Sequence, residues 1–375
     1  MMPVRVLDKR ERLDWLQLIR TPNIGPITFH QLIAKYGAAD AALAALPDIA
    51  RGGAGKAPLE AADRGRLEQE LLHAERCGAR LIAACEPDYP AMLAEIPGAP
   101  PLIYVCGDTA FFEKPAVAII GARNASGAGR KFARILAAEL GQAGFIIVSG
   151  LARGIDGAAH QASLETGTIA VVAGGVDVIY PPEHKELTEQ IAKDGAVISE
   201  CPMGYQPTAK DFPRRNRLIS GLSHGVVVVE AAARSGTMIT VRYALEQGRE
   251  VFAAPGSPLD PRSAGANRLI RDGATLIQSA NDILELLDAQ IRRPVNKRDG
   301  FLDAGFARPP ADHKDADMAG LRVQLLEILS FTPLHRDEIL REVDGAAGPV
   351  ADALLDLVLS GEAVEHEGGR FSLGE

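Results

Sequence analysis

Seven cationic side chains lie in the segments that follow apolar runs of residues 112–291, where they could bind phosphate groups. Each of them alone is an ordinary solvated surface charge. An enzyme that acts on a small phosphate compound needs only one or two such groups, whereas a set of this size suits a polyanion held along its backbone. The set consists of Arg123, Arg153, Lys185, Lys210, Arg214, Arg215 and Arg217.

The apolar segments alternate with amphipathic stretches, which is the pattern of an α/β domain. Their uniformly apolar composition indicates strands buried on both faces, as in a Rossmann-like, mostly parallel sheet flanked by helices. Ligands bind such sheets beyond the carboxyl ends of the strands, so we expect the cations to share one edge. The predicted strands are Arg80–Ala84, Leu102–Cys106, Val117–Gly121, Phe145–Gly150, Thr168–Ala173, Ala196–Glu200, Gly225–Ala231, Arg249–Pro255 and Ala274–Gln278, with helices such as Gly129–Ala143, Pro182–Lys193 and Gly236–Gln247 between them.

Glycine-rich turns follow two of these strands, one opening at Gly121 and one at Gly150. Glycine permits a close backbone approach, and a following helix offers its N-terminus to an anion. We therefore expect Gly121, Ser126 and Gly150 to contact phosphate together with Arg123. The turn lacks the GxGxxG dinucleotide pattern and no acidic residue ends the next strand, so we expect no NAD.

The segment KDFPRRNR has four basic residues and one acidic residue, and it begins at the end of a long loop predicted at Cys201–Phe212. It supplies Lys210, Arg214, Arg215 and Arg217, and Asn216 joins them as an expected contact. The few aromatic side chains that could stack on bases near this edge are Tyr180, Tyr205 and Phe212.

Metal-binding patterns are weak in the sequence. Asp156 and His160 are spaced i, i+4, but no third ligand is nearby, so a structural role is favoured, with Asp156 placed to cap a helix. The four cysteines are scattered without a CxxC pair. This arrangement indicates neither a disulfide framework nor a zinc ribbon, and it fits a reducing compartment.

The net charge of −9 argues at first against a nucleic-acid partner, but its distribution is uneven. Residues 316–375 contain four arginines, no lysine and twelve acidic residues, a net charge of 4 − 12 = −8. Residues 112–291 have 18 basic and 19 acidic residues and are close to neutral. A local basic patch in that region can therefore dominate binding.

Four segments are predicted along the chain: a helical domain at 1–78, the Rossmann-like domain at 79–291, a linker at 292–315 and a domain at 316–375. The first resembles a helix-hairpin-helix or SAM-like module around Thr21–Pro26, although a small helical packing module is favoured for it. In the last, helices at Leu321–Leu329, His335–Val343 and Val350–Ser360 precede a hairpin that turns at Gly368 and Gly369, which is typical of a winged helix.

Neither a secretory signal nor a membrane segment is predicted. The N-terminal residues are charged, and no apolar run approaches the roughly 18 residues that a membrane helix needs. We therefore expect a soluble, cytoplasmic protein without a membrane partner.

Seven segments of the chain, in order, closely resemble the DNA-processing protein A (DprA or Smf) family. They are GARNASGAG, SGLARGIDGAAHQASL, TIAVVAGGVDVIYPPEHKEL, ISECPMGYQP, FPRRNRLISGLS, VVVVEAAARSGTMITVRYALEQGREVFAAPG and GANRLIRDGA. The resemblance implies a protein that binds single-stranded DNA, protects incoming DNA in natural transformation and loads RecA recombinase. It also implies a homodimer without a cofactor, with DNA contacts at Arg123, Lys185 and the FPRRNR segment.

A dimer interface is predicted at the last α/β unit of the sheet. The basis is an apolar set near the sheet edge together with the family resemblance, and a closed dimer would place two DNA sites side by side. The set consists of Leu269, Ile270, Leu276 and Ile277, some of which serve the core in the alternative interpretation.

Two other functions are less consistent with the sequence. The sheet is similar to phosphoribohydrolase-like nucleotide enzymes, but Thr240 stands where their catalytic glutamate would be, so an enzyme is not expected. A transcription regulator is not favoured either, because the helix at Val350–Ser360 contains Asp352 and Asp356 and no basic residue, whereas a helix in the major groove normally brings basic or amide side chains.

Overall fold

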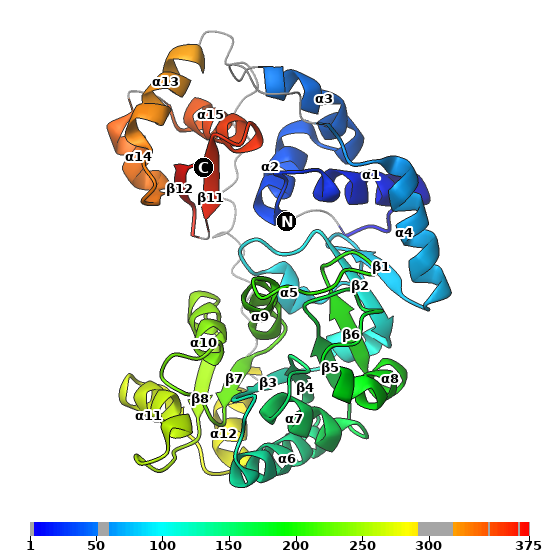
Figure 1. The fold of residues 1–375 in the computed structure, drawn as a ribbon, viewed down its shortest axis with the longest axis vertical. Coiled ribbons are helices and arrows are strands. Elements are labelled where there is room, and N and C mark those ends of the chain that lie inside the picture. Colours follow the sequence, from blue (N-terminus) through cyan, green and yellow to red (C-terminus); the bar gives the residue numbers. More distant parts are fainter. Residues whose placement is uncertain (1–3, 52–59, 292–317, 344–345, 367, 375) are drawn as a thin grey trace. The chain divides into compact units, whose positions relative to one another are not determined.

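The computed structural model describes residues 4–51, 60–291, 318–343, 346–366 and 368–374 (Figure 1). By its contacts the chain divides into two compact units, one of Met1–Val6 and Glu68–Pro294 and the other of Leu7–Leu67 and Val295–Glu375. These units do not coincide with the predicted domains, whose boundaries stay a prediction. The predicted linker at 292–315 lies outside the described residues.

The first unit contains a nine-stranded sheet in the order β1-β2-β6-β5-β4-β3-β7-β8-β9. β1 and β2 pair antiparallel with their neighbours, and the pairs from β6 to β9 are all parallel. The predicted mostly parallel sheet is therefore confirmed. The strands are β1 (Arg80–Ala83), β2 (Leu102–Gly107), β3 (Ala116–Ile120), β4 (Ile146–Ser149), β5 (Thr168–Val171), β6 (Ala196–Ser199), β7 (Gly225–Val228), β8 (Glu250–Ala253) and β9 (Thr275–Leu276).

Helices cover both faces of this sheet, because alternate residues of each strand point to opposite sides. In β3, Val117 and Ile119 pack into one hydrophobic cluster while Ala116, Ala118 and Ile120 pack into another. The first cluster takes residues from α6 (Gly127–Gln142), α7 (Ile155–Ser163) and α12 (Ala280–Ile291). The second takes residues from α5 (Ala91–Ala94), α9 (Asp211–Gly221), α10 (Thr237–Glu246) and α11 (Ala264–Arg271).

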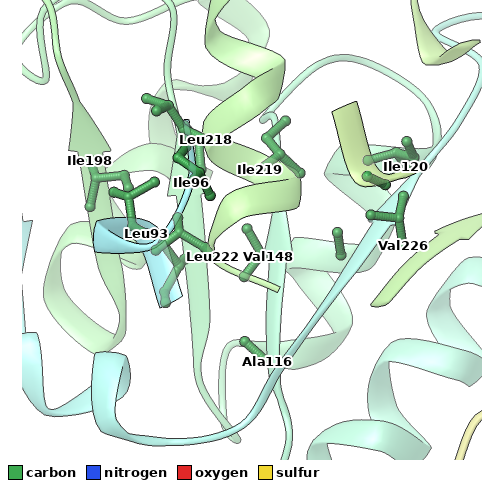
Figure 2. Close-up of a cluster of buried hydrophobic side chains, with 14 of the residues drawn as sticks. Leu93, Ile96, Ala116, Ile120, Val148, Ile198, Leu218, Ile219, Leu222 and Val226 are labelled. Atoms are coloured by element: carbon green, nitrogen blue, oxygen red, sulfur yellow. The ribbon is translucent and has the colours of Figure 1, made fainter. Parts of the chain in front are cut away.

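Figure 2 shows the second cluster, in which Leu93 of α5 and Leu218 and Leu222 of the α9 segment gather with Ile198 of β6. The first unit also contains α8 (Lys185–Asp194) and the short helices η1 (Thr109–Glu113), η2 (Pro182–His184) and η3 (Pro261–Ser263). Because both faces are buried, functional side chains of the sheet are left to its strand ends.

The segment after β6 differs from the predicted loop at its C-terminal end. Residues after the loop at Cys201 form α9 from Asp211 on, so the basic segment is helical. A helix sends residues spaced three to four apart to the same side, and Asp211, Arg215 and Leu218 are all buried. The consequence for the candidate site is described below.

The second unit contains α1 (Lys9–Arg20), α2 (Pro26–Tyr36), α3 (Ala39–Arg51) and the C-terminal elements. The latter are α13 (Met318–Ile328), β10 (Leu334–His335), α14 (Arg336–Glu342), α15 (Ala347–Leu359), β11 (Ala363–His366) and β12 (Arg370–Leu373), with the strands in the order β10-β12-β11. Three helices with this small sheet form the predicted winged helix. Helix α4 (Arg64–Arg76) spans the boundary between the two units.

The predicted dimer residues divide between core and surface. Leu269 is 8% exposed and Ile277 is fully buried, and they belong to the two hydrophobic clusters. Ile270 packs partly buried against the same cluster as Leu269. Leu276 is 45% exposed and is the member of the set that can contact a partner without rearrangement.

No helix in the described part of the chain combines the length and the apolar character that crossing a membrane requires.

Candidate nucleic-acid interface

A cavity of about 370 Å³ opens at the carboxyl ends of β3, β4 and β5. Its volume lies near the lower end of the range for small-ligand sites, roughly 300–1,000 Å³. Its walls come from the turns after those three strands, from the loop after β6 and from the start of α9. The cavity is lined by Arg123, Asn124, Gly150, Leu151, Ala152, Arg153, Val172, Ala173, Gly174, Val178, Tyr180, Pro181, Pro207, Phe212 and Arg215.

An arginine and two aromatic rings form one wall of this cavity. The guanidinium of Arg123 lies over the Phe212 ring, 4.9 Å from its centroid. The Tyr180 ring lies 5.2 Å from the Phe212 ring and is 46% exposed. This wall combines a permanent positive charge with flat apolar surface, which are the two features that hold single-stranded nucleic acid.

Arg153 and Lys185 are exposed cations after β4 and β5. Arg153 pairs with Glu183 on the surface, and Lys185 lies 4.0 Å from Glu189. Exposed ion pairs of this kind contribute little to stability, so a phosphate can exchange for the carboxylate at low cost. Arg153 lines the cavity, whereas Lys185 is not among its lining residues.

Arg215 differs from the expectation for a surface cation, because its side chain is 5% exposed. Its Nη1 donates to the carbonyl oxygens of Gly150, at 2.6 Å, and Val171. Burial lowers the pKa of the guanidinium to about 10, while Asp156 opposes that shift. Arg215 therefore joins the ends of β4 and β5 beneath the cavity rather than standing free at its rim.

Asp156 and His160 are buried in α7 beside this arginine. Asp156 is not the helix cap, since Gly154 with φ of +82° holds that position, and the Asp156 carboxylate instead accepts from the Ala152 N–H at 3.3 Å. Burial raises the pKa of the Asp156 carboxyl, against the opposing charge of Arg215. Nδ1 of His160 lies 2.7 Å from Thr168 Oγ1, and burial lowers the His160 pKa to about 3.

Two further cations of α9 converge on one carboxylate. Arg217 is buried, bonds to Glu200 and donates to the Gly98 carbonyl at 2.9 Å. Arg214 is exposed, and its Nε lies 3.2 Å from another oxygen of Glu200. Arg217 is thus a buried structural cation, contrary to its expected place on the rim.

Ser126 and Gly121 also have partners within the protein. The Ser126 hydroxyl accepts from Gly129 N–H at 2.8 Å and caps α6, and its own N–H donates to Glu230 at 2.9 Å. A second bond joins the Ser126 hydroxyl to the same carboxylate. The expected anion position at the start of α6 is therefore filled by Glu230.

Glycine is required at both predicted turn positions for packing. A side chain at Gly121 would meet Ile155 and the Glu230 carbonyl, and one at Gly150 would meet the Arg215 guanidinium. Gly150 nevertheless lines the cavity, whereas Gly121 does not.

The structure thus brings Arg123, Gly150, Arg153 and Arg215 together around one cavity. Lys210 and Asn216 are outside its lining, with Lys210 exposed and Asn216 donating to the Gly236 carbonyl at 3.4 Å. Sequence reasoning did not single out Asn124, Gly174, Val178 or Pro207. Asn124 adjoins Arg123 in the same turn, which was the available signal, while Pro207 comes from a loop whose path no local pattern indicates.

Three family models match the chain. Residues 80–288 match the model of DNA recombination-mediator protein A, residues 9–72 the DprA-like N-terminal HHH domain, and residues 308–369 the DprA winged helix domain. Together they account for the sheet and for the helical and winged-helix elements.

Known proteins similar to this chain carry the same family names. Protein Smf of Synechocystis is 34% identical over 96% of this chain and 98% of its own length. DNA processing protein DprA of Bacillus subtilis is 42% identical over 59% of this chain and 76% of its own length. The first of these matches spans nearly the whole chain, and the second spans somewhat more than half of it.

Two solved structures show the same fold. The structure of DNA processing protein A from Streptococcus pneumoniae is 34% identical, with a TM-score of 0.62 over 76% of this chain and 98% of its own. That of the Helicobacter pylori protein, described for its single-stranded DNA binding mode, is 29% identical, with a TM-score of 0.52 over 56% of this chain and 96% of its own.

Proposed function

The chain belongs to the family of DNA recombination-mediator protein A, the DprA or Smf proteins, and from this premise we propose that it binds single-stranded DNA. The cavity at the carboxyl ends of β3, β4 and β5 is the proposed center of binding. A nucleotide of the strand enters this cavity, and the neighbouring phosphates follow the exposed cations around it. The protein acts by binding, in the cytoplasm, without chemistry on the DNA.

The wall formed by Arg123, Phe212 and Tyr180 is the observation that carries the proposal. It offers a charge to the phosphate and a ring face to a base, and neither feature depends on which base is present. The Helicobacter pylori relative, described for single-stranded DNA binding, supports the same activity here.

The proposed contacts are graded by exposure. Arg123 and Arg153 reach a phosphate directly, and the exposed Lys185, Lys210 and Arg214 extend the path. Arg215 supports the site from below, and Arg217 fixes α9 to Gly98 and Glu200, because their guanidinium groups are already bound to carbonyl and carboxylate oxygens. Gly121 and Ser126 shape the turn, and Gly150 and Asn216 stay proposed contacts.

The binding experiment compares a labelled oligo-dT strand with a duplex of equal length at several salt concentrations. The strand is expected to bind more tightly, with little dependence on its sequence and a strong loss of affinity as salt rises. Equal or tighter binding of the duplex at every salt concentration would refute the proposal.

We also propose that the protein protects the strand and passes it to RecA recombinase, as the resemblance to DprA proteins implies; the matching family model is described as a recombination mediator. The measurement is the rate of RecA filament formation on oligo-dT coated by a single-strand binding protein. The chain should raise this rate, and the Arg123→Ala variant should raise it less.

A homodimer through the last α/β unit is the third part of the proposal, with Leu276 as its exposed apolar contact. Sedimentation velocity at micromolar concentration should show a dimer, and Leu276→Glu should shift it toward monomer because a charge would be buried. Matched Leu72→Glu, at a residue 50% exposed in α4 and outside this unit, should leave the dimer intact. A wild-type chain that sediments only as a monomer would contradict this part.

A further inference from the structure

We propose that His73, Cys77 and Asp177 form a binding site for a transition-metal ion, with Zn²⁺ as the ion that suits this set. Their ligand atoms all lie within 4.8 Å of one another. Nε2 of His73 is 2.8 Å from Oδ2 of Asp177, and Sγ of Cys77 is 3.8 Å from the same nitrogen. One imidazole, one thiol and one carboxylate thus converge on a single point.

These distances are close to those of a tetrahedral zinc site. With zinc about 2.0 Å from nitrogen and oxygen and about 2.3 Å from sulfur, two ligand atoms lie roughly 3.3 to 3.6 Å apart. The 2.8 Å between His73 Nε2 and Asp177 Oδ2 is below this range, and the 3.8 Å between His73 Nε2 and Cys77 Sγ is above it. Side-chain shifts of about half an ångström would bring both separations to the values of a zinc site.

The local backbone places two of the ligands on one side of a helix. His73 lies in the last turn of α4, and the Cys77 N–H donates to the His73 carbonyl at 3.1 Å, which continues the helical turn. Residues four apart on a helix are neighbours, so the imidazole and the thiol point the same way. Both are exposed and accessible to an ion from solution.

Asp177 is held in position before any ion arrives. Its two oxygens accept from the Gly204 N–H at 2.8 and 3.0 Å, and its side chain is 13% exposed. Gly175 leaves room for it, because a side chain there would meet Asp177 Oδ1. A hydrogen-bonded, oriented carboxylate is what a metal site gains from its surroundings.

The chemistry of the set favours zinc over magnesium or calcium. Magnesium and calcium prefer oxygen ligands, whereas imidazole and thiolate select borderline and soft ions. The thiol of Cys106 in β2 lies within electrostatic reach of both Cys77 and Asp177, which makes the neighbourhood richer in sulfur. A simple ion pair between His73 and Asp177 would not need a thiol beside the same nitrogen.

The position of the site gives it a structural consequence. Asp177 lies between cavity-lining residues Gly174 and Val178, and Gly204 precedes cavity-lining Pro207. An ion bound here would connect α4 to the loop after β5, which contains Asp177. Because Asp177 also accepts from the Gly204 N–H, the ion would be linked to the loop after β6 as well. Both loops contribute walls to the cavity.

The test uses the full-length chain, stripped with a chelator, dialysed and kept reduced with a phosphine, and titrated with Co²⁺ as the probe. One equivalent of Co²⁺ should produce the visible absorption of tetrahedral cobalt and a thiolate charge-transfer band, and Zn²⁺ should then displace it. The readout is spectroscopic, so it is independent of the proposed DNA binding. A wild-type chain without the charge-transfer band would overturn the proposal.

Single variants assign the ligands. Cys77→Ser should abolish the charge-transfer band. His73→Gln and Asp177→Asn should each weaken Co²⁺ binding by about 100-fold. Loss of a residue that only hydrogen-bonds to a metal ligand already weakens binding by up to about this factor. Cys201→Ser is the matched control, since its thiol donates to the Ala173 carbonyl and its loss should leave the spectrum unchanged. A band that survives Cys77→Ser or disappears in Cys201→Ser would contradict the assignment.

Discussion

Arg123 and Arg215 line the same cavity but meet different surroundings. Arg123 is exposed, and its guanidinium rests on the Phe212 ring. Arg215 is buried, and its guanidinium donates hydrogen bonds to backbone carbonyl oxygens. An exposed cation can exchange water for phosphate, whereas a buried one must first break its internal bonds, so their substitution should have different effects.

Arg123→Ala should weaken binding to oligo-dT and flatten its salt dependence. Loss of one phosphate contact lowers the slope of log affinity against log salt by about 0.7 for a single strand. Lys114→Ala is the matched control, because Lys114 is exposed just before the other end of the same strand, β3. Fluorescence anisotropy at several salt concentrations measures both. Identical slopes for Arg123→Ala and the wild type would place the phosphate contacts elsewhere.

Arg215→Ala should mainly lower the stability of the sheet unit. The change leaves the carbonyls of Gly150 and Val171 without this donor and removes the charge beside buried Asp156, which costs about 3 kcal/mol of unfolding free energy. Arg214→Ala, at the exposed neighbouring position, should cost less than about 1 kcal/mol. Urea unfolding compares the two, and equal midpoints would show that Arg215 is not a structural cation.

At the scale of elements, α7 and α9 decide which side chains reach the cavity. Helix α9 turns Asp211, Arg215 and Leu218 toward the protein and leaves Arg214 in solvent. Helix α7 follows a tight connection in which Leu151 has a φ of +56° and Gly154 one of +82°, and it buries His160 against the sheet. A side chain at Gly154 would meet the Ala122 carbonyl, which shows how closely this connection approaches the turn that contains Arg123.

The buried His160 in α7 should make the sheet unit sensitive to acid. Its folded-state pKa is about 3, below the ordinary value of 6.5, chiefly because of burial, with His184 and Arg215 nearby. Below 6.5 the unfolded chain therefore binds a proton that the folded chain does not, and stability falls as pH decreases from 6.5 toward 3.

The His160→Asn variant, which keeps a donor but does not titrate in this range, should show a smaller loss of unfolding free energy over that interval. Urea unfolding at a series of pH values gives the slope for each protein. Parallel curves for the variant and the wild type would mean that His160 does not cause the acid sensitivity.

At the scale of the whole molecule, charge is partitioned between the parts of the chain. The segment from residue 316 on has a net charge of −8, while the region that forms the cavity is close to neutral. Helix α15 contains Asp352 and Asp356 and no basic residue. A phosphate backbone should be repelled by this domain, so we propose that it serves a protein contact instead.

Truncation after Ile291 should leave oligo-dT affinity unchanged or slightly tighter, because a long-range repulsion is removed. Circular dichroism checks that the shortened chain is folded, and anisotropy measures its affinity. A tenfold loss, or about 1.4 kcal/mol, would mean that the C-terminal domain contacts the strand directly.

The strands and their order along the chain follow from the sequence alone. A buried parallel strand requires an uninterrupted apolar run, and such runs are visible without a structure, so β3 to β8 were each predicted to within three residues. The winged helix and the edge at which Arg123, Arg153 and Lys185 stand were predictable for the same reason: local patterns and the direction of parallel strands determine them.

Tertiary structure alone decided which polar groups are available at that edge. Arg215 and Arg217 look like surface cations in the sequence, and only the packing of α9 on the sheet buries them. Glu230 occupies the start of α6 from a position 104 residues away from Ser126. His73 and Asp177 are also 104 residues apart in the sequence. No local sequence pattern predicts their contact, because contacts between distant segments depend on how the elements pack and not on residue spacing.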